Sequence, residues 1–329
     1  MRKTSRQAAD FRWAIGAGPD EWALARMRKA FPRPREPMGE AWFMGKQRRM
    51  FTELIENDIT GLRPAALIDP LREIASGTGS FGRMREWRDW FNHLLPHLVP
   101  MAGPPNGGEI RELLISGFFT QYPADMPYLP YREFRADALA TLGCTIMGAG
   151  DWSGNPPMLK RMVGDDGRFA NEAWPWRGTG GDISACLFFC LRYLPVSTIG
   201  DWAASALTID DPHWRAQLMI WLVGARRILG NPKAQPADLS DQYPSIEWSL
   251  ADCLKGNYSG SFAEPVVPEP FIPIANRSAF DRAVAAFFTP QLRQGWIDSI
   301  DAVDYLANGA APAMSALEAM LDGLQIAQT

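Results

Sequence analysis

Apolar residues recur at intervals of three and four along most of this chain, and this spacing limits its possible folds more than any other feature. The segment after Asp211-Pro212 shows the pattern most clearly, because Trp214, Leu218 and Leu222 share one helical face. Alternating apolar and polar runs, which indicate strands, are scarce. The sequence therefore predicts an all-α protein.

Helix start and stop signals divide the chain into separate helices. A first helix is expected between Asp20-Glu21 and Pro32, with acidic residues at its start and basic residues toward its end. Further helices are predicted at about 39–57, 64–75, 82–98, 108–119, 131–147, 182–194, 198–207, 212–229, 278–290 and 312–325.

Residues 183–229 combine ACLFFCLRYLP with TIGDWAASALTIDDPHWRAQLMIWLVGARRIL, including the start Asp-Pro-x-Trp-Arg. This stretch resembles the helix pairs of HEAT-type repeats. The resemblance covers about a seventh of the chain and implies stacked antiparallel helix pairs, with no activity attached. An irregular helical array and an α/α toroid are alternative architectures with similar sequence patterns.

Two segments interrupt the helical pattern and suggest a division of the chain. Residues 148–181 form a long loop rich in Gly, Pro and Trp, and residues 231–277 form a Pro-rich segment expected to run extended. The predicted organisation is a helical body at 1–230, an extended linker at 231–277, and an acidic helical cap at 278–329.

Composition and hydropathy place the chain among packed globular proteins. Hydrophobic residues make up 47% and charged residues 21%. No signal-peptide pattern follows the N-terminus, and the apolar stretches are shorter than the roughly 20 residues that span a bilayer. We therefore expect a soluble, cytoplasmic protein without a membrane partner.

Cysteines, histidines and one glycine motif are the usual places to seek a metal or cofactor. Cys186 and Cys190 share a helical face but lack two further zinc ligands, so we expect them in the core. Asp89, His93 and His97 are four apart, yet Pro96 disturbs the helix between the histidines. The glycines of GTGSFG at 77–82 follow a predicted helix and not a strand. No metal or cofactor is predicted.

The loop at 148–181 is the candidate ligand site, because it places aromatic rings beside acids and a guanidinium. The ligand-binding candidates are Trp152, Trp174, Trp176 and Arg177, and the acid/base candidates are Asp151, Asp165 and Asp166. Such a set suits a glycan or another small molecule. The alternative is that the tryptophans pin the loop to the helical body.

Charge is distributed unevenly along the chain. Residues 1–50 hold twelve Lys and Arg against five Asp and Glu, a net +7, while the whole chain carries −4. No Lys or Arg follows Arg293. We expect the basic front, including Arg48 and Arg49, to contact an acidic surface, either the chain's own tail or a protein partner, and not nucleic acid.

These observations favour a binding or scaffold protein that presents a helical surface to a protein partner, because stacked helices make broad surfaces. The alternative function is a hydrolase or lyase, possibly directed at a glycan, whose site is the loop at 148–181.

Overall fold

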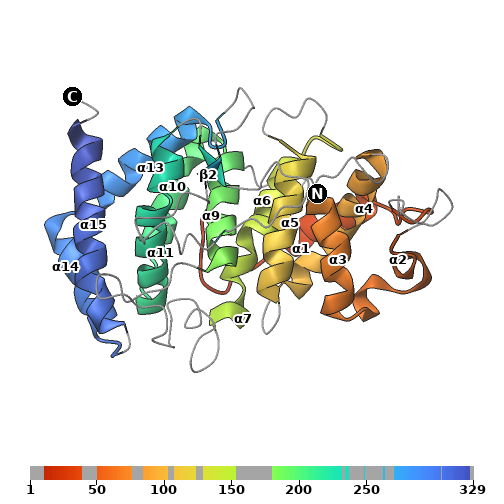
Figure 1. Cartoon of the computed structure of the whole chain (residues 1–329), viewed down its shortest axis with the longest axis horizontal. Helices are drawn as coiled ribbons and strands as arrows, with labels where there is room; N and C mark the ends of the chain where they lie inside the picture. Colours follow the sequence, from red (N-terminus) through yellow and green to blue (C-terminus); the bar gives the residue numbers. More distant parts are fainter. Residues whose placement is uncertain are drawn as a thin grey trace, which may run out of the picture. The chain divides into compact units, whose positions relative to one another are not determined.

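A computed structural model describes the chain in several stretches. These are residues 11–38, 50–75, 84–102, 107–123, 129–152, 180–231, 234–236, 248, 262–263, 270–304 and 306–326. The protein is all-α, as the spacing of its apolar residues predicts (Figure 1). The only strand pairing in these stretches joins β1 (Gln235–Pro236) to β2 (Phe262–Ala263), two residues each.

The chain forms two compact units. Unit 1 comprises Met1–Ala17, Ala149–Pro236 and Glu247–Thr329, and unit 2 comprises Gly18–Gly148 and Ala237–Ile246. The organisation predicted from the sequence has its boundaries at residues 230 and 277. The helices after 273 pack within unit 1 against helices from 181–230, so packing between segments distant in the sequence joins them in one unit.

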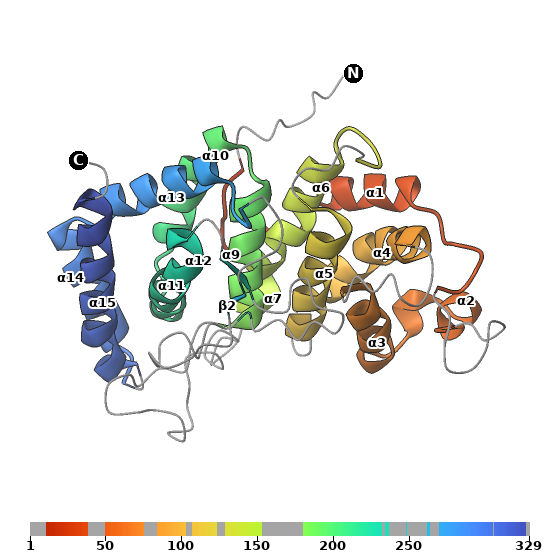
Figure 2. The ribbon, with the colours of Figure 1, turned by 45° about the horizontal axis from the view of Figure 1, so that its top comes forward.

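Unit 2 contains short and long helices that enclose an apolar core. They are α1 (Glu21–Ala30), α2 (Glu53–Glu56), η3 (Ile59–Gly61), α3 (Pro64–Ala75), α4 (Met84–Leu98), η4 (Val99–Met101), α5 (Gly107–Gln121), α6 (Phe134–Thr141) and η5 (Leu142–Met147). α3 packs along α5, and α1 packs against α4 and α6 (Figure 2). Aromatic rings from α4, α5 and α6 meet in the core, where Phe118 stacks on Phe134.

Unit 1 contains α7 (Ala149–Trp152), α9 (Gly181–Tyr193), α10 (Val196–Leu207), α11 (Pro212–Gly224), α12 (Arg226–Gly230), α13 (Ile274–Phe287), α14 (Pro290–Asp301) and α15 (Ala307–Ile326). α9 and α11 run in parallel. Gly180 N–H donates to the Gln217 side chain at 2.8 Å, and four residues further along both helices Trp221 Nε1 donates to Ser184 Oγ at 3.1 Å. α15 lies beside α11 and α14 (Figures 1 and 2).

α10 and α13 also run in parallel in unit 1. The Asn276 side chain donates to the carbonyl of Leu194 at 2.9 Å, and further along both helices the rings of Trp202 and Phe280 are 5.9 Å apart. Segments far apart in the sequence therefore pack side by side in this unit.

The prediction of one long helix over 39–57 is wrong for the part that the structure describes. Phe51 has a φ of +53°, a left-handed backbone value that no α-helix contains, and α2 begins only at Glu53. Residues 39–49 lie outside the described stretches. Apolar spacing alone did not reveal this interruption.

Candidate functional site

Helix α1 begins with a side-chain cap. The carboxylate of Asp20 accepts a hydrogen bond from the Ala23 N–H at 2.7 Å. Glu21 lies in the first turn, and Arg28 and Lys29 lie in the last, an order of charges that stabilises the helix dipole. α1 therefore begins at the signal that predicts it.

One face of α1 is buried and supplies its packing free energy. Ala23, Leu24 and Met27 are buried on the side that meets α4 and α6. Fully burying a side chain such as Leu or Met stabilises a fold by about 1.5–3 kcal/mol. The position of α1 in unit 2 is therefore set by its apolar face.

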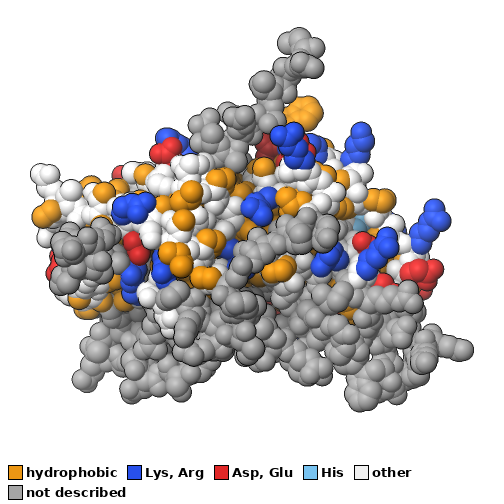
Figure 3. All heavy atoms as spheres, turned by 90° about the horizontal axis from the view of Figure 1, so that it is seen from above, with side chains coloured by type: hydrophobic (Ala, Val, Ile, Leu, Met, Phe, Trp, Pro, Cys, Tyr) orange, Lys and Arg blue, Asp and Glu red, His pale blue; other side chains and the backbone are white. Residues whose placement is uncertain are grey.

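The opposite face of α1 carries an exposed tryptophan beside basic side chains. Trp22 is 77% exposed, the highest value among the exposed large hydrophobic residues described. Arg26 and Lys29 follow at four and seven residues, which puts all three on one helical stripe. We call Trp22, Arg26 and Lys29 the α1 face. Figure 3 shows basic side chains interspersed with hydrophobic ones on the described surface.

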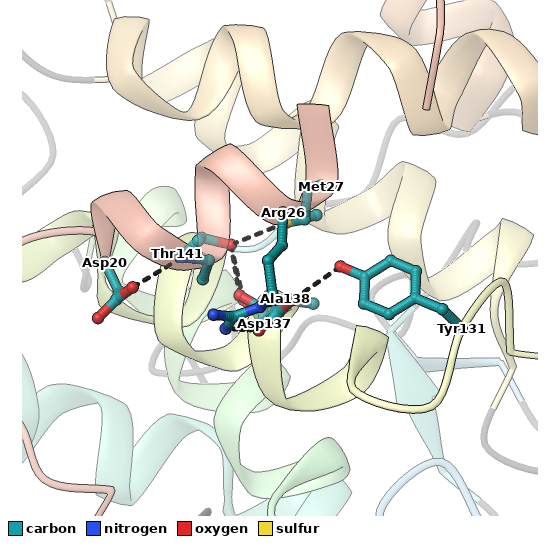
Figure 4. A network of polar contacts seen from close by, with 8 residues as sticks. Asp20, Arg26, Met27, Tyr131, Asp137, Ala138 and Thr141 are labelled. Atoms are coloured by element: carbon teal, nitrogen blue, oxygen red, sulfur yellow. Dashed lines mark hydrogen bonds and ion pairs between the residues drawn. The ribbon is translucent and has the colours of Figure 1, made fainter. Parts of the chain in front are cut away.

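A polar network fixes Arg26 of the α1 face to α6. Its Nε donates to Asp137 Oδ2 at 3.1 Å, and a terminal guanidinium nitrogen donates to the other carboxylate oxygen. Tyr131 donates from its hydroxyl to Asp137 Oδ2 at 2.8 Å. Figure 4 shows the guanidinium and the phenol converging on this one carboxylate. Asp137 is only 2% exposed, whereas Arg26 is 55% exposed.

The network shifts the protonation of two of its members. Hydrogen bonding to Asp137 raises the pKa of Arg26 above its already high ordinary value. Burial raises the pKa of Tyr131, and its hydrogen bond to Asp137 adds to the shift. The guanidinium therefore stays charged and the phenol stays neutral over the physiological pH range.

The loop that the sequence favours as a ligand site is described only at its two ends, residues 148–152 and 180–181. Asp151 and Trp152 end α7, where Asp151 is 9% exposed. The Trp152 ring lies 5.7 Å from the ring of Trp214 on α11. The other candidates, Asp165, Asp166, Trp174, Trp176 and Arg177, lie outside the described residues.

Trp152 belongs to a tryptophan cluster in the core of unit 1. Trp13 contacts Trp202 and Trp214 edge to face, with ring centroids 5.3 and 5.8 Å apart. Trp214 also donates from its indole nitrogen to the Ala206 carbonyl at 2.8 Å. At Trp152 the structure therefore shows the packing contact that a pinning role requires.

The remaining predicted features lie either in the core or outside the described residues. Cys186 and Cys190 are buried on α9, as expected of core thiols. Among the described residues, no three His, Cys, Asp or Glu side chains are grouped as metal ligands. The glycine motif at 77–82, and Arg48 and Arg49 of the basic front, lie outside them.

The exposed position of Trp22 can be predicted from helical spacing, although an apolar residue in a helix is usually expected in the core. Trp22 is one residue from the buried stripe of Ala23 and Met27, and a helical projection places it beside Arg26 on the polar side. Asp137, by contrast, is 111 residues from Arg26, and no nearby sequence pattern indicates that it binds this guanidinium.

Comparison of the chain with family models, with curated proteins and with solved structures found no match. None of the helices in the described stretches combines the length and the hydropathy needed to cross a bilayer. The fold and the α1 face are therefore the basis for a functional proposal.

Proposed function

We propose that this chain is a binding or scaffold protein that presents the α1 face to an acidic protein partner. The observation that carries the proposal is Trp22, a 77% exposed indole on a helix whose other large apolar side chains are buried. Trp and Arg are the residue types most enriched among side chains that dominate the free energy of protein association.

The chemistry of the α1 face supports an acidic partner with an apolar anchor. The Trp22 ring offers a flat apolar surface, and Lys29 and the exposed part of Arg26 offer positive charge beside it. Asp137 holds the Arg26 guanidinium in one place, so little side-chain entropy is lost on binding. From the sequence, Arg48 and Arg49 of the basic front are proposed to contact the same partner.

A protein partner is favoured over nucleic acid by charge. The first 50 residues carry +7, but the chain as a whole carries −4, so its remainder repels a polyanion. An acidic protein segment can match a local basic surface without approaching the acidic remainder.

The alternative function, a hydrolase or lyase with its site at 148–181, rests on the sequence. Of its candidate residues, the described ones are Asp151 and Trp152. Trp152 packs against Trp214, so part of its ring is already covered. This contact favours the binding proposal over the enzymatic one.

Selection of a random peptide display library on the immobilised protein tests the binding proposal. We expect the enriched peptides to combine Asp or Glu with an aromatic or aliphatic residue, and Trp22→Ala to weaken their binding at least tenfold. Leu292→Ala, at an exposed apolar position of unit 1, is the matched control and should bind as the wild type does.

Charge reversal of Arg48 and Arg49 should weaken the same peptides, and the loss should shrink as salt screens exposed charges over a Debye length of about 8 Å or less. Two results would contradict the proposal. One is peptide binding that is equal in Trp22→Ala and wild type. The other is tighter binding of duplex DNA than of the peptides at the same salt concentration.

A further inference from the structure

Two of the three histidines in the chain lie ring against ring on α4. His93 and His97 are one helical turn apart, and their ring centroids are 4.9 Å apart. Pro96 lies between them inside the helix. His93 lies against the residue that follows α1, and η3 packs against α4, so three separate parts of unit 2 meet at this helix.

His93 connects α4 to the end of α1. It is 7% exposed, and its Nδ1 lies 3.1 Å from the carbonyl oxygen of Phe31, the residue that follows α1. A carbonyl oxygen only accepts hydrogen bonds, so Nδ1 carries the proton when the ring is neutral. Protonation then occurs at Nε2 and places a charge in a buried site.

Two arginines bring positive charge to the same place. Arg28 of α1 donates to the Pro96 carbonyl at 3.2 Å. Arg33 donates from Nε to the Leu54 carbonyl at 3.0 Å and also donates to the carbonyl of Asn57, which ties α2 and the residue that follows it to the segment after α1.

One carboxylate partly offsets these charges. Asp58 caps η3 through Thr60 and favours the charged form of His97. On α4 itself, the Asp89 carboxylate lies 3.6 Å from the Arg85 guanidinium, which partly neutralises its charge. Protonating both histidines would therefore place two imidazolium groups beside two guanidinium groups, with the Asp58 carboxylate as the nearby negative charge.

The surroundings oppose protonation of both rings. Burial lowers the pKa of His93, and Arg33 lowers it further, while the bond to Phe31 acts in the opposite direction. Burial lowers the pKa of His97, as do His93 and Arg28, against the opposing effect of Asp58. Both pKa values lie below the ordinary value of about 6.5.

We propose that the His93–His97 pair is an acid-sensitive latch in unit 2. With neutral rings, His93 holds Phe31, the residue that follows α1, against α4; proton uptake would charge buried rings beside Arg28 and Arg33 and release the C-terminal end of α1. The latch is a property of unit 2 and does not depend on what the α1 face binds.

The sign of the effect follows from the direction of the pKa shifts. The released form has histidines with ordinary pKa values, so it binds more protons than the closed form. The opening equilibrium is therefore independent of pH above about pH 6.5, and opening becomes more favourable as the pH falls below that value. The opening equilibrium constant rises up to about tenfold per pH unit for each histidine that takes up a proton. Glu73 of α3 has a pKa raised mainly by burial. Its effect has the opposite sign, because a carboxyl with a raised pKa in the folded state makes that state more stable as the pH falls.

Hydrogen exchange on the whole chain tests the latch, with rates corrected for the intrinsic effect of pH. Between about pH 7.5 and 5.5, we expect protection at the end of α1 to fall, by up to about tenfold for each histidine that takes up a proton. Protection of α11 in unit 1 should not change. Unchanged protection at α1, or an equal loss in both units, would overturn the proposal.

Substitutions assign the effect to the pair. His97→Gln and His93→Asn, which keeps a donor toward Phe31, should each reduce the pH dependence of α1 protection. His213→Gln removes the third histidine, in unit 1, and should leave that dependence intact. If a variant does not fold, an NMR titration of the wild-type rings still decides. Titration of both rings at or above about pH 6.5 would refute the latch.

Discussion

Trp22 on α1 and Trp214 on α11 are the same residue type in opposite surroundings. Trp214 is fully buried, contacts two other indoles and donates a hydrogen bond from its ring nitrogen, whereas Trp22 leaves most of its ring in water. The chain has thirteen tryptophans, so a count of them says nothing about binding. The difference shows that exposure on a fixed helix, and not residue type, marks a candidate binding residue.

The largest expected effect is at the buried end of this comparison. Trp214→Ala should lower the free energy of unfolding by about 3–5 kcal/mol, because it leaves a cavity beside Trp13 and Trp152. Denaturant unfolding followed by hydrogen exchange in unit 1 measures the loss. A change below about 1 kcal/mol would mean that the cluster is not part of a tightly packed core.

An intermediate effect is expected in the network that supports the α1 face. Asp137→Asn removes the charge that accepts two Arg26 bonds, and hydrogen bonds to charged groups contribute about 1.5–3 kcal/mol. We expect a loss of about 2 kcal/mol, discounted toward the lower value because Arg26 is more than half exposed. A double-mutant cycle with Arg26→Ala measures the coupling free energy, which should vanish if the pair is only a surface contact.

The smallest effect is expected at Trp22. Trp22→Ala should change the free energy of unfolding by about 0.5 kcal/mol or less, since the ring is largely exposed. The same variant should weaken peptide binding at least tenfold, as proposed above. A thermal melt beside the binding measurement separates the two quantities, and a large loss of stability would assign Trp22 to the core instead.

Local signals in the sequence predicted much of the fold. The apolar spacing predicted a helix over 64–75, and α3 spans those residues. The helix predicted at 212–229 is present but divides at Ala225 into α11 and α12. Helix α14 was missed, although Thr289 caps it and Pro290 occupies its first turn, because the preceding helix was extended through that signal.

The candidate site was less predictable, for a physical reason. The exposure of Trp22 depends on which side of α1 meets α4 and α6, and the bond from Arg26 to Asp137 depends on where α6 lies. Both are long-range outcomes of packing. The loop residues chosen from the sequence, such as Asp165 and Trp174, lie outside the described stretches and stay predictions.

The way the chain is divided between the units has a consequence for the order of folding during synthesis. The described helices of unit 2 all come from residues 18–148. Unit 1 instead joins Trp13 to Ser205, and Trp202 to Phe280, so its core needs segments made early and late. Contacts between distant segments form slowly because long loops must close first. The helices of unit 2 can therefore pack while the later part of unit 1 is still being synthesised. Trp13 cannot pack until Trp202 and Trp214 have been made.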